Sequence, residues 1–362
     1  MMRFTLYFII INLLFISCDS SLDINADYKN IPVVYSLLDK NDSIQYIKLN
    51  KAFLGDASVS EMAKISDSLN YDNAIVNLIK YKDYKIVNTF SFERTDTIKK
   101  DEGFFADDNN IIYIYKGNII NKKDNGSDAE RPSEFNFVLD IKIPGIDKVS
   151  SQTKTVSDVR ILAPLGISYR KEIITYSNKY VNPEYKYKSG KDAKYFEYFI
   201  EISYYENING AYRLRTISHK EGINSSPTSD GDYTFSFLLN GKSFYQTIAN
   251  NITNSSSERI FYSIRYKFMS AGEDLTMYID LTKPTYGIVQ EKPAFTNITN
   301  GWGLFSSRTS TYSPYKILNI SSLNHLAVGE ITKEFDFKNY SDTYIFYSNN
   351  RDLDIYKLYI TP

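Results

Sequence analysis

The stretch Phe135-Asn-Phe-Val-Leu-Asp-Ile-Lys-Ile143 decides the fold class of this chain. All of its odd-numbered positions are apolar, whereas Asp140 and Lys142 lie at even-numbered positions. Because successive side chains of a β-strand point to opposite faces, this period of two predicts a strand with one buried face and one solvent-exposed face. Pro144-Gly145 ends the strand, and residues 149–156 supply a returning one. The stretch therefore predicts an antiparallel sheet.

The sequence before this strand contains two further pairs of strand-like runs. They are residues 31–38 with 43–53, and residues 74–81 with 84–93. Short strands separated by turn residues favour a β-sandwich, which we place at residues 31–162. Residues 58–69 predict a short helix inserted between strands, because Ser58 and Glu61 fit a capping box.

Residues 163–362 predict a second β-rich domain. The stretch 195–206 alternates like a strand, and Asn209-Gly210 is typical of a two-residue hairpin turn. Tyrosines are frequent here, and aromatic side chains fit the pleated, half-buried surface of a sheet. The whole chain holds 32 Tyr and 22 Phe, which agrees with a mainly β fold.

Helices are expected to be few in this second domain. Apolar positions at helical spacing predict a helix over residues 242–250, and residues 275–281 fit either a helix or a strand. The chain ends in two predicted strands, at 343–347 and 353–360. We therefore expect one or two short helices among the strands of residues 163–362.

Charge and histidine content limit the classes of partner. The formal net charge is −1, and a nearly neutral chain lacks the basic face that nucleic-acid binding requires. The two histidines, His219 and His325, are far apart in the sequence, which disfavours a histidine-rich metal site. We expect no nucleic-acid partner, no metal site and no cofactor.

The amino terminus has the layout of a secretory signal. Arg3 is followed by a short apolar run over residues 4–16, too short for a comfortable bilayer span. The run ends Leu14-Phe-Ile-Ser-Cys18, which resembles the lipobox of bacterial lipoproteins, with Phe15 in place of the usual leucine. We predict a signal peptide at residues 1–17 and lipidation of Cys18, and two or more acyl chains anchor a protein durably.

The cysteine content agrees with this role for Cys18. It is the only cysteine of the chain, so no intramolecular disulfide can form. The alternative is an ordinary signal peptide with an incidental cysteine. Residues 18–30 are polar and predict a flexible tether between the lipid and the first domain.

Four phrases of the sequence together resemble a known group of proteins. They are Pro32-Val-Val-Tyr-Ser-Leu-Leu-Asp39, Gln45-Tyr-Ile-Lys-Leu-Asn-Lys-Ala-Phe-Leu-Gly55, Gly287-Ile-Val-Gln-Glu-Lys-Pro293 and Asn300-Gly-Trp-Gly-Leu-Phe-Ser-Ser-Arg308. The group consists of uncharacterised outer-membrane lipoproteins of Bacteroidota, often encoded beside TonB-dependent receptors. The resemblance implies an immunoglobulin-like first domain, a β-rich second domain, an outer-membrane location and a TonB-dependent receptor as partner. It implies no activity.

The last of these phrases contains a candidate ligand platform. Trp302, Phe305 and Arg308 could together stack on a sugar or a peptide, and glycines beside Trp302 allow a close backbone approach. The simpler interpretation is a tight turn whose aromatic side chains fill the core. The Tyr-rich stretches 176–187 and 195–205 likewise fit either a glycan-binding surface or ordinary sheet residues.

Catalytic patterns are missing from the sequence. The acidic pairs Asp101-Glu102, Asp107-Asp108 and Asp230-Gly-Asp232 lie in polar loops, as solvated charges usually do, rather than as the facing carboxyls of a glycosidase. No Gly-x-Ser-x-Gly, P-loop or His-Glu-x-x-His motif occurs. We therefore expect no catalytic residues and no enzyme.

Three triplets fit the Asp-Ser/Thr-apolar pattern that Bacteroidota use for periplasmic O-glycosylation. They are Asp42-Ser-Ile44, Asp67-Ser-Leu69 and Asp96-Thr-Ile98. They predict modification at Ser43, Ser68 and Thr97.

Three functions compete at this stage. The leading hypothesis is a lipid-anchored accessory or binding protein of the outer membrane, without catalytic activity, that partners a TonB-dependent transporter. The alternative is a glycan-binding surface lipoprotein. An envelope hydrolase is the third and least supported hypothesis.

Overall fold

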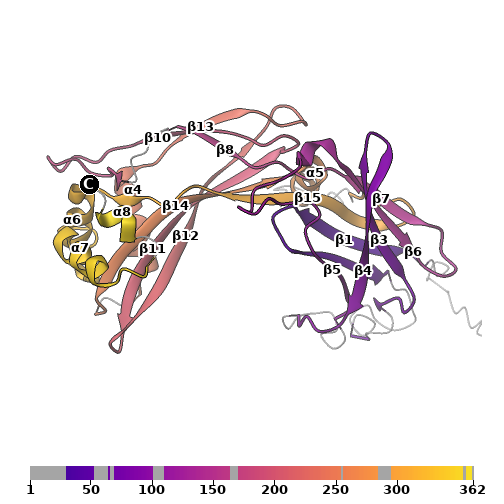
Figure 1. The fold of residues 1–362 in the computed structure, drawn as a ribbon, viewed down its shortest axis with the longest axis horizontal. Helices are drawn as coiled ribbons and strands as arrows, with labels where there is room; N and C mark the ends of the chain where they lie inside the picture. Colours follow the sequence, from indigo (N-terminus) through magenta and orange to yellow (C-terminus); the bar gives the residue numbers. More distant parts are fainter. Residues whose placement is uncertain are drawn as a thin grey trace, which may run out of the picture.

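The computed structural model describes residues 30–52, 64–65, 69–100, 110–163, 170–253, 256–283, 295–353 and 356–360. The fold is mainly β, as predicted. Eleven strands form one mixed sheet in the order β12-β11-β14-β15-β1-β2-β5-β4-β3-β6-β7. Figure 1 shows two lobes, with the early strands in one and most of the later strands and helices in the other.

The large sheet contains strands from both halves of the sequence. Its members are β1 (Pro32–Asp39), β2 (Ile44–Lys51), β3 (Ile75–Lys82), β4 (Lys85–Thr95), β5 (Ile112–Lys116), β6 (Asn136–Lys142), β7 (Val149–Thr153), β11 (Tyr195–Ile208), β12 (Ala211–Ser225), β14 (Arg259–Ala271) and β15 (Trp302–Tyr312). The smaller sheets contain β8 (Arg160–Ala163), β10 (Glu184–Lys188) and β13 (Thr234–Leu238), and β9 (Arg170–Lys171) with β16 (Ile317–Leu318).

The first lobe is one ladder of strands that bends until its two ends meet. The apolar face of β6 is buried as its alternation predicts, with Phe137, Leu139 and Ile141 fully covered. At the far edge, the Ser150 N–H donates to the Thr299 carbonyl oxygen (3.3 Å), and the Thr299 N–H donates to the Ser150 carbonyl oxygen (2.8 Å). This bridge joins β7 to the segment that leads into β15, so the curled sheet encloses its own core.

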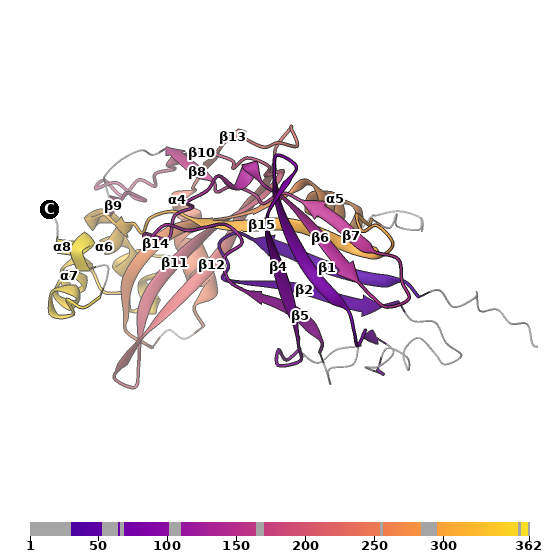
Figure 2. The ribbon, with the colours of Figure 1, turned by 45° about the vertical axis from the view of Figure 1, so that its right-hand side comes forward.

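Strand β15 connects the two lobes. It pairs in parallel with β1, from Val33–Trp302 to Asp39–Arg308, and antiparallel with β14, from Lys267–Tyr312 to Ala271–Arg308. Figure 2 shows β15 spanning from the lobe of β1 to the lobe of β14. One ladder therefore crosses the boundary that we predicted at residue 162, although each lobe has its own cluster of buried apolar side chains.

A buried lysine fixes the end of β1 against its surroundings. The Lys40 ammonium donates to Asp128 (2.9 Å) and to Asp158 (2.7 Å), and its side chain is 1% exposed. The neighbouring Asn41 amide donates to the Thr309 hydroxyl on β15 (2.9 Å). Because an unpaired charge at this depth costs several kcal/mol, the two carboxylates make the position of Lys40 stable.

The second lobe is built on a long hairpin and several helices. β11 and β12 join at Asn209 and Gly210, both with positive φ (54° and 85°), as the predicted two-residue turn requires. The helices of this lobe are α4 (Gly241–Asn251), α6 (Ile320–Val328), α7 (Tyr340–Asn349) and α8 (Tyr356–Ile360), with a 3-10 turn at Lys333–Phe335, whereas α5 (Glu273–Thr282) and the 3-10 turn at Pro132–Glu134 lie with the first lobe (Figure 1). The predicted helix over 242–250 is confirmed as α4, and the ambiguous stretch 275–281 lies in α5.

The prediction of two final strands is wrong. Residues 343–347 lie in α7, and most of the run 353–360 lies in α8. Asn339 begins α7 by accepting a hydrogen bond from the Asp342 N–H (3.0 Å), and Thr343 and Tyr347, four residues apart, form its buried face. With α4 to α8 present, one or two helices was also too few. The predicted helix at 58–69 lies largely outside the described residues.

Gly303 allows β15 to lie directly against β1. Its φ is +117°, and a Cβ built there would lie 1.9 Å from the Val34 carbonyl oxygen, the residue that pairs with it in register. Any larger side chain would push the two strands apart while also holding a backbone conformation that L-residues rarely adopt.

We predict that Gly303→Ala destabilises the protein by about 3 kcal/mol or more, since backbone strain of roughly 1–3 kcal/mol adds to the clash. Urea unfolding of the full-length protein measures this loss. Gly145→Ala is the matched control, because Gly145 also has a positive φ (+76°) but has no atom within 4 Å of the added Cβ. Gly145→Ala should lower the free energy of unfolding by about 1–2 kcal/mol. Equal losses for the two variants would contradict the close approach of β15 to β1.

Candidate functional site

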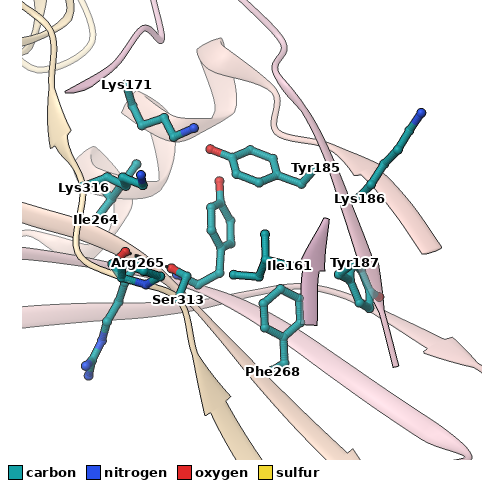
Figure 3. Close-up of a pocket in the computed structure, with 12 residues that line it drawn as sticks. Ile161, Lys171, Tyr185, Lys186, Tyr187, Ile264, Arg265, Phe268, Ser313 and Lys316 are labelled. Carbon is teal, nitrogen blue, oxygen red and sulfur yellow. Dashed lines mark hydrogen bonds between the residues drawn. The ribbon is translucent and has the colours of Figure 1, made fainter. Parts of the chain in front are cut away.

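A cavity of about 300 Å³ lies in the second lobe, and its lining residues come from β14, β8, β10, the turn after β15, and the β9–β16 pair. This volume is at the lower end of the range for small-molecule sites. Figure 3 shows the side chains around it. They are Ile161, Lys171, Tyr185, Lys186, Tyr187, Ile264, Arg265, Tyr266, Phe268, Ser313, Pro314 and Lys316.

Backbone pairing holds one wall of the cavity in place. The Ser313 N–H donates to the Tyr266 carbonyl oxygen (2.8 Å), and the Ser313 hydroxyl accepts from the Tyr266 N–H (2.8 Å). Lys316 and Ile264 exchange two backbone hydrogen bonds, of 2.9 and 2.8 Å. The segment after β15 is therefore fixed to β14, and the amide groups of Ser313 and Lys316 are already used.

The opposite wall carries Lys171 and Tyr185. Lys171 lies in β9, which pairs with β16, and its carbonyl oxygen accepts from the Asn319 N–H (2.8 Å). Its ammonium lies 5.1 Å from the centroid of the Tyr185 ring, within the range of a cation–π contact. In Figure 3 the polar ends of Lys171, Lys316 and Tyr185 point toward one another.

Burial perturbs both lysines. It lowers the pKa of Lys171 to about 8, and the neighbouring positive charge of Lys316 lowers it further in the same direction. The pKa of Lys316 is also lowered by burial. Desolvation disfavours the charged form of each ammonium, and two nearby cations repel each other.

Two buried tyrosines add polar groups without regular partners. The rings of Tyr185 and Tyr266 lie 4.4 Å apart, centroid to centroid. Within the described part of the chain, neither phenol oxygen meets the geometric criteria of a hydrogen bond, although the two hydroxyls are close enough to shift each other's pKa. Burial raises the pKa of Tyr185 to about 12 and that of Tyr266 well above its usual value, so both phenols stay protonated donors at neutral pH.

The other two cations at the cavity direct their charge elsewhere. Lys186 pairs with Glu184 (3.5 Å), and the Arg265 guanidinium donates to Glu201 (2.7 Å). Figure 3 shows both charged groups pointing away from the cavity. The inward-facing polar groups are therefore two ammoniums and two phenols, over a floor that includes Ile264 and Phe268.

The three residues of the predicted ligand platform do not converge. Phe305 is fully buried in the core of the first lobe, so it cannot stack on a ligand. Trp302 is 48% exposed at the start of β15, and Arg308 is exposed roughly 20 Å further along the same strand. Trp302 instead lies beside Asn30 and Ile31, where the described chain begins.

The Tyr-rich stretches supply core residues more than surface. Tyr185, Tyr187, Tyr195 and Tyr204 are buried, whereas Tyr176 is almost fully exposed. Exposed aromatic residues elsewhere are scattered over several elements. Across the described ranges, no exposed row of Tyr and Trp of the kind expected for glycan binding forms around Trp302.

The remaining predicted positions divide between exposed and undescribed residues. Ser43 and Thr97 are exposed, so a modifying enzyme has access to both hydroxyls. Cys18 and Ser68, and the acidic pairs at 101–102 and 107–108, lie outside the described residues. No group of three or more His, Cys, Asp or Glu in the described part of the chain is arranged to hold a metal ion. No helix in the described ranges has the length and apolar character needed to cross a bilayer.

No protein-family model matches the chain, and no curated protein matches it.

We predict that Lys171 titrates near pH 8, well below an ordinary lysine, because burial and Lys316 disfavour its charged form. NMR of the ¹³C-dimethylated lysines of the full-length protein measures this, with Lys171→Arg used to assign the signal. Lys316→Met should raise the pKa of Lys171 without restoring the ordinary value, because burial remains. A Lys171 signal that titrates above pH 10 would show that the ammonium is solvated.

Proposed function

We propose that this protein is a non-catalytic binding protein of the cell envelope, held at the outer membrane by lipid on Cys18 and working beside a TonB-dependent transporter. The observation that carries the binding role is the cavity between Lys171 and Tyr266. Its inward-facing groups can attract and orient a ligand.

The chemistry of the cavity supports binding rather than reaction. Among the described residues that line the cavity there is no Asp, Glu or His, so its lining offers no carboxylate or imidazole base. The hydroxyl of Ser313 is already engaged by Tyr266 and by the Pro314 carbonyl oxygen (3.2 Å). A serine hydroxyl that is already engaged, and two phenols that stay protonated, favour a site that holds its ligand unchanged.

The surroundings of residue 30 support attachment to a membrane. Trp302 is half exposed beside Asn30 and Ile31, at the end of the polar tether that leads to Cys18. Tryptophan is enriched where proteins meet the membrane–water interface. An exposed Trp at the point where the tether enters the fold agrees with a lobe that rests near the bilayer.

Replacing the lipid-bearing cysteine tests the anchor. In Cys18→Ser cells, the protein should move from the outer-membrane fraction to the soluble fraction, because the diacylglycerol has no sulfur to join. Its melting temperature should stay unchanged, since Cys18 makes no disulfide. A Cys18→Ser protein that still sediments with outer membranes would contradict lipid anchorage.

The same preparation tests the partner. Wild-type protein extracted in mild detergent should co-purify with a TonB-dependent transporter, and the soluble Cys18→Ser protein shows whether the contact needs the membrane. Absence of a transporter from the detergent-extracted complex would remove this partner from the proposal.

A further inference from the structure

Trp302 lies at the end of the first lobe where the described chain begins. It lines a groove together with Asn30, Ile31 and Ile146, and its side chain is 48% exposed. Within the described residues, no hydrogen bond, second ring or cation engages its indole. An indole combines a large apolar body with one N–H donor, so the exposed part of Trp302 leaves apolar surface in water. Packing of the described fold does not account for this surface.

The backbone around Trp302 holds its side chain outward. Trp302 pairs in register with Val33, whereas the next residue of β1, Val34, is fully buried in the core of the first lobe. Because successive side chains of a strand alternate, Val33 and Trp302 point away from that core. On the preceding side, the Asn300 amide donates to the Lys148 carbonyl oxygen (3.0 Å). The exposure of Trp302 is therefore set by a paired strand.

A second exposed apolar side chain lies beside a lysine at the same end of the sheet. The ladder of strand pairs places the starts of β1, β3 and β15 there, together with the ends of β2 and β6. Ile75, the first residue of β3, is 58% exposed and pairs in register with Lys142, the last residue of β6. The Lys142 side chain is exposed and has no ion pair with a described residue.

The chemistry of these side chains suits the surface of a bilayer. An indole N–H can donate to a headgroup oxygen while the ring lies against the upper acyl chains, which is why Trp is enriched at this depth. The Ile75 side chain adds apolar surface, and a lysine such as Lys142 can keep its ammonium in the headgroup layer beside it.

The predicted lipid brings a bilayer within reach of Trp302. Residues 19–29 separate Cys18 from Asn30, so the chain between the lipid and the first lobe spans at most about 40 Å. A connection of this length gives the linked surface an effective concentration of about millimolar. A contact between Trp302 and lipid that is too weak to hold the protein alone is therefore populated once Cys18 is anchored.

We propose that this end of the first lobe docks on the bilayer surface, with Trp302 at the level of the lipid headgroups. The proposal rests on the lipid anchor of the proposed function and adds the part of the fold that contacts the membrane.

Docking at this end also orients the molecule. β15 begins at Trp302 in the first lobe and ends at Tyr312, which pairs with Lys267 on β14 in the second lobe. Figure 1 shows β6 and β7 at one end of the long axis and α6 and α7 at the other. The second lobe, with its cavity, is therefore directed away from the membrane.

Fluorescence of Trp302 tests the contact without any substitution, because it is the only tryptophan of the chain. The lipid-bearing full-length protein is reconstituted into vesicles of phosphatidylethanolamine and phosphatidylglycerol, and soluble Cys18→Ser is the unanchored reference. In vesicles the emission should shift to shorter wavelength, and quenching by acrylamide should fall by about threefold, because lipid replaces water around the ring. Lipid brominated near the headgroup should quench the emission.

A relocated tryptophan is the matched control for the orientation. Trp302→Phe combined with Tyr176→Trp moves the reporter to the second lobe, where Tyr176 is 95% exposed. Acrylamide should quench this reporter equally in vesicles and in the soluble Cys18→Ser background, and brominated lipid should not quench it. Melting curves establish that the variant is folded, and the wild-type measurement does not depend on it.

Three results would overturn the proposal. Equal acrylamide quenching of Trp302 in vesicles and in soluble Cys18→Ser would show that the ring stays in water. Protection from acrylamide without quenching by brominated lipid would place the ring against a second copy of the protein. Quenching of the Tyr176→Trp reporter by brominated lipid would reverse the orientation.

Flotation of the same vesicles reports the anchor separately. Protein that floats with the vesicles while Trp302 stays in water would contradict docking and leave the lipid anchor standing. Protein that does not float would contradict the anchor itself, so failure of this proposal is distinguishable from failure of the proposed function.

Discussion

The parallel pairing of β1 with β15 is the interaction on which the rest of the molecule depends. Strands from opposite ends of the sequence lie side by side over seven residue pairs, from Val33–Trp302 to Asp39–Arg308. The approach is close enough that Gly303 has no space for a side chain against Val34. Bringing β1 and β15 together closes a long loop of the chain, which costs conformational entropy. The backbone hydrogen bonds between the two strands and the burial of Phe305 must offset this cost.

The ligand cavity follows from the same pairing. β15 pairs with β14 over Lys267 to Ala271, and β14 supplies the cavity floor at Ile264 and Phe268. Where β15 ends, Ser313 and Lys316 are fixed to β14 by backbone hydrogen bonds. The position of the Lys316 ammonium therefore depends on where β15 enters and leaves the sheet. The cavity in the second lobe thus depends on β15, the strand that also completes the sheet of the first lobe.

Local pattern predicted the strands but not their connections. The alternation of residues 135–143 identified β6, and Asn209-Gly210 identified the turn of the β11–β12 hairpin, because both signals lie within a few adjacent residues. The final helices were missed because Tyr, Phe and Ile favour strands on average. In the structure, the Asn339 N-cap and the burial of Tyr347 stabilise a helix at residues 340–349 instead.

The cavity could not be predicted from sequence for a related reason. Lys171, Tyr185, Tyr266 and Lys316 come from four separate segments, and tertiary packing alone brings them together. Phe305 and Trp302 lie near each other in the sequence, yet one is buried and the other exposed, since the strand directs them differently. The one usable signal was the pair of lysines close to apolar strand residues, and many surface strands have such lysines.

Native-state hydrogen exchange of the full-length protein tests the central claim most directly, because each backbone amide reports the opening that exposes it. If β15 holds the two lobes together, the amides of β15 should exchange with the same free energy as those of β1 and β14, at the global stability. Exchange of β15 through a smaller opening, with β1 and β14 still protected, would show that the two lobes stand without it and would contradict the account.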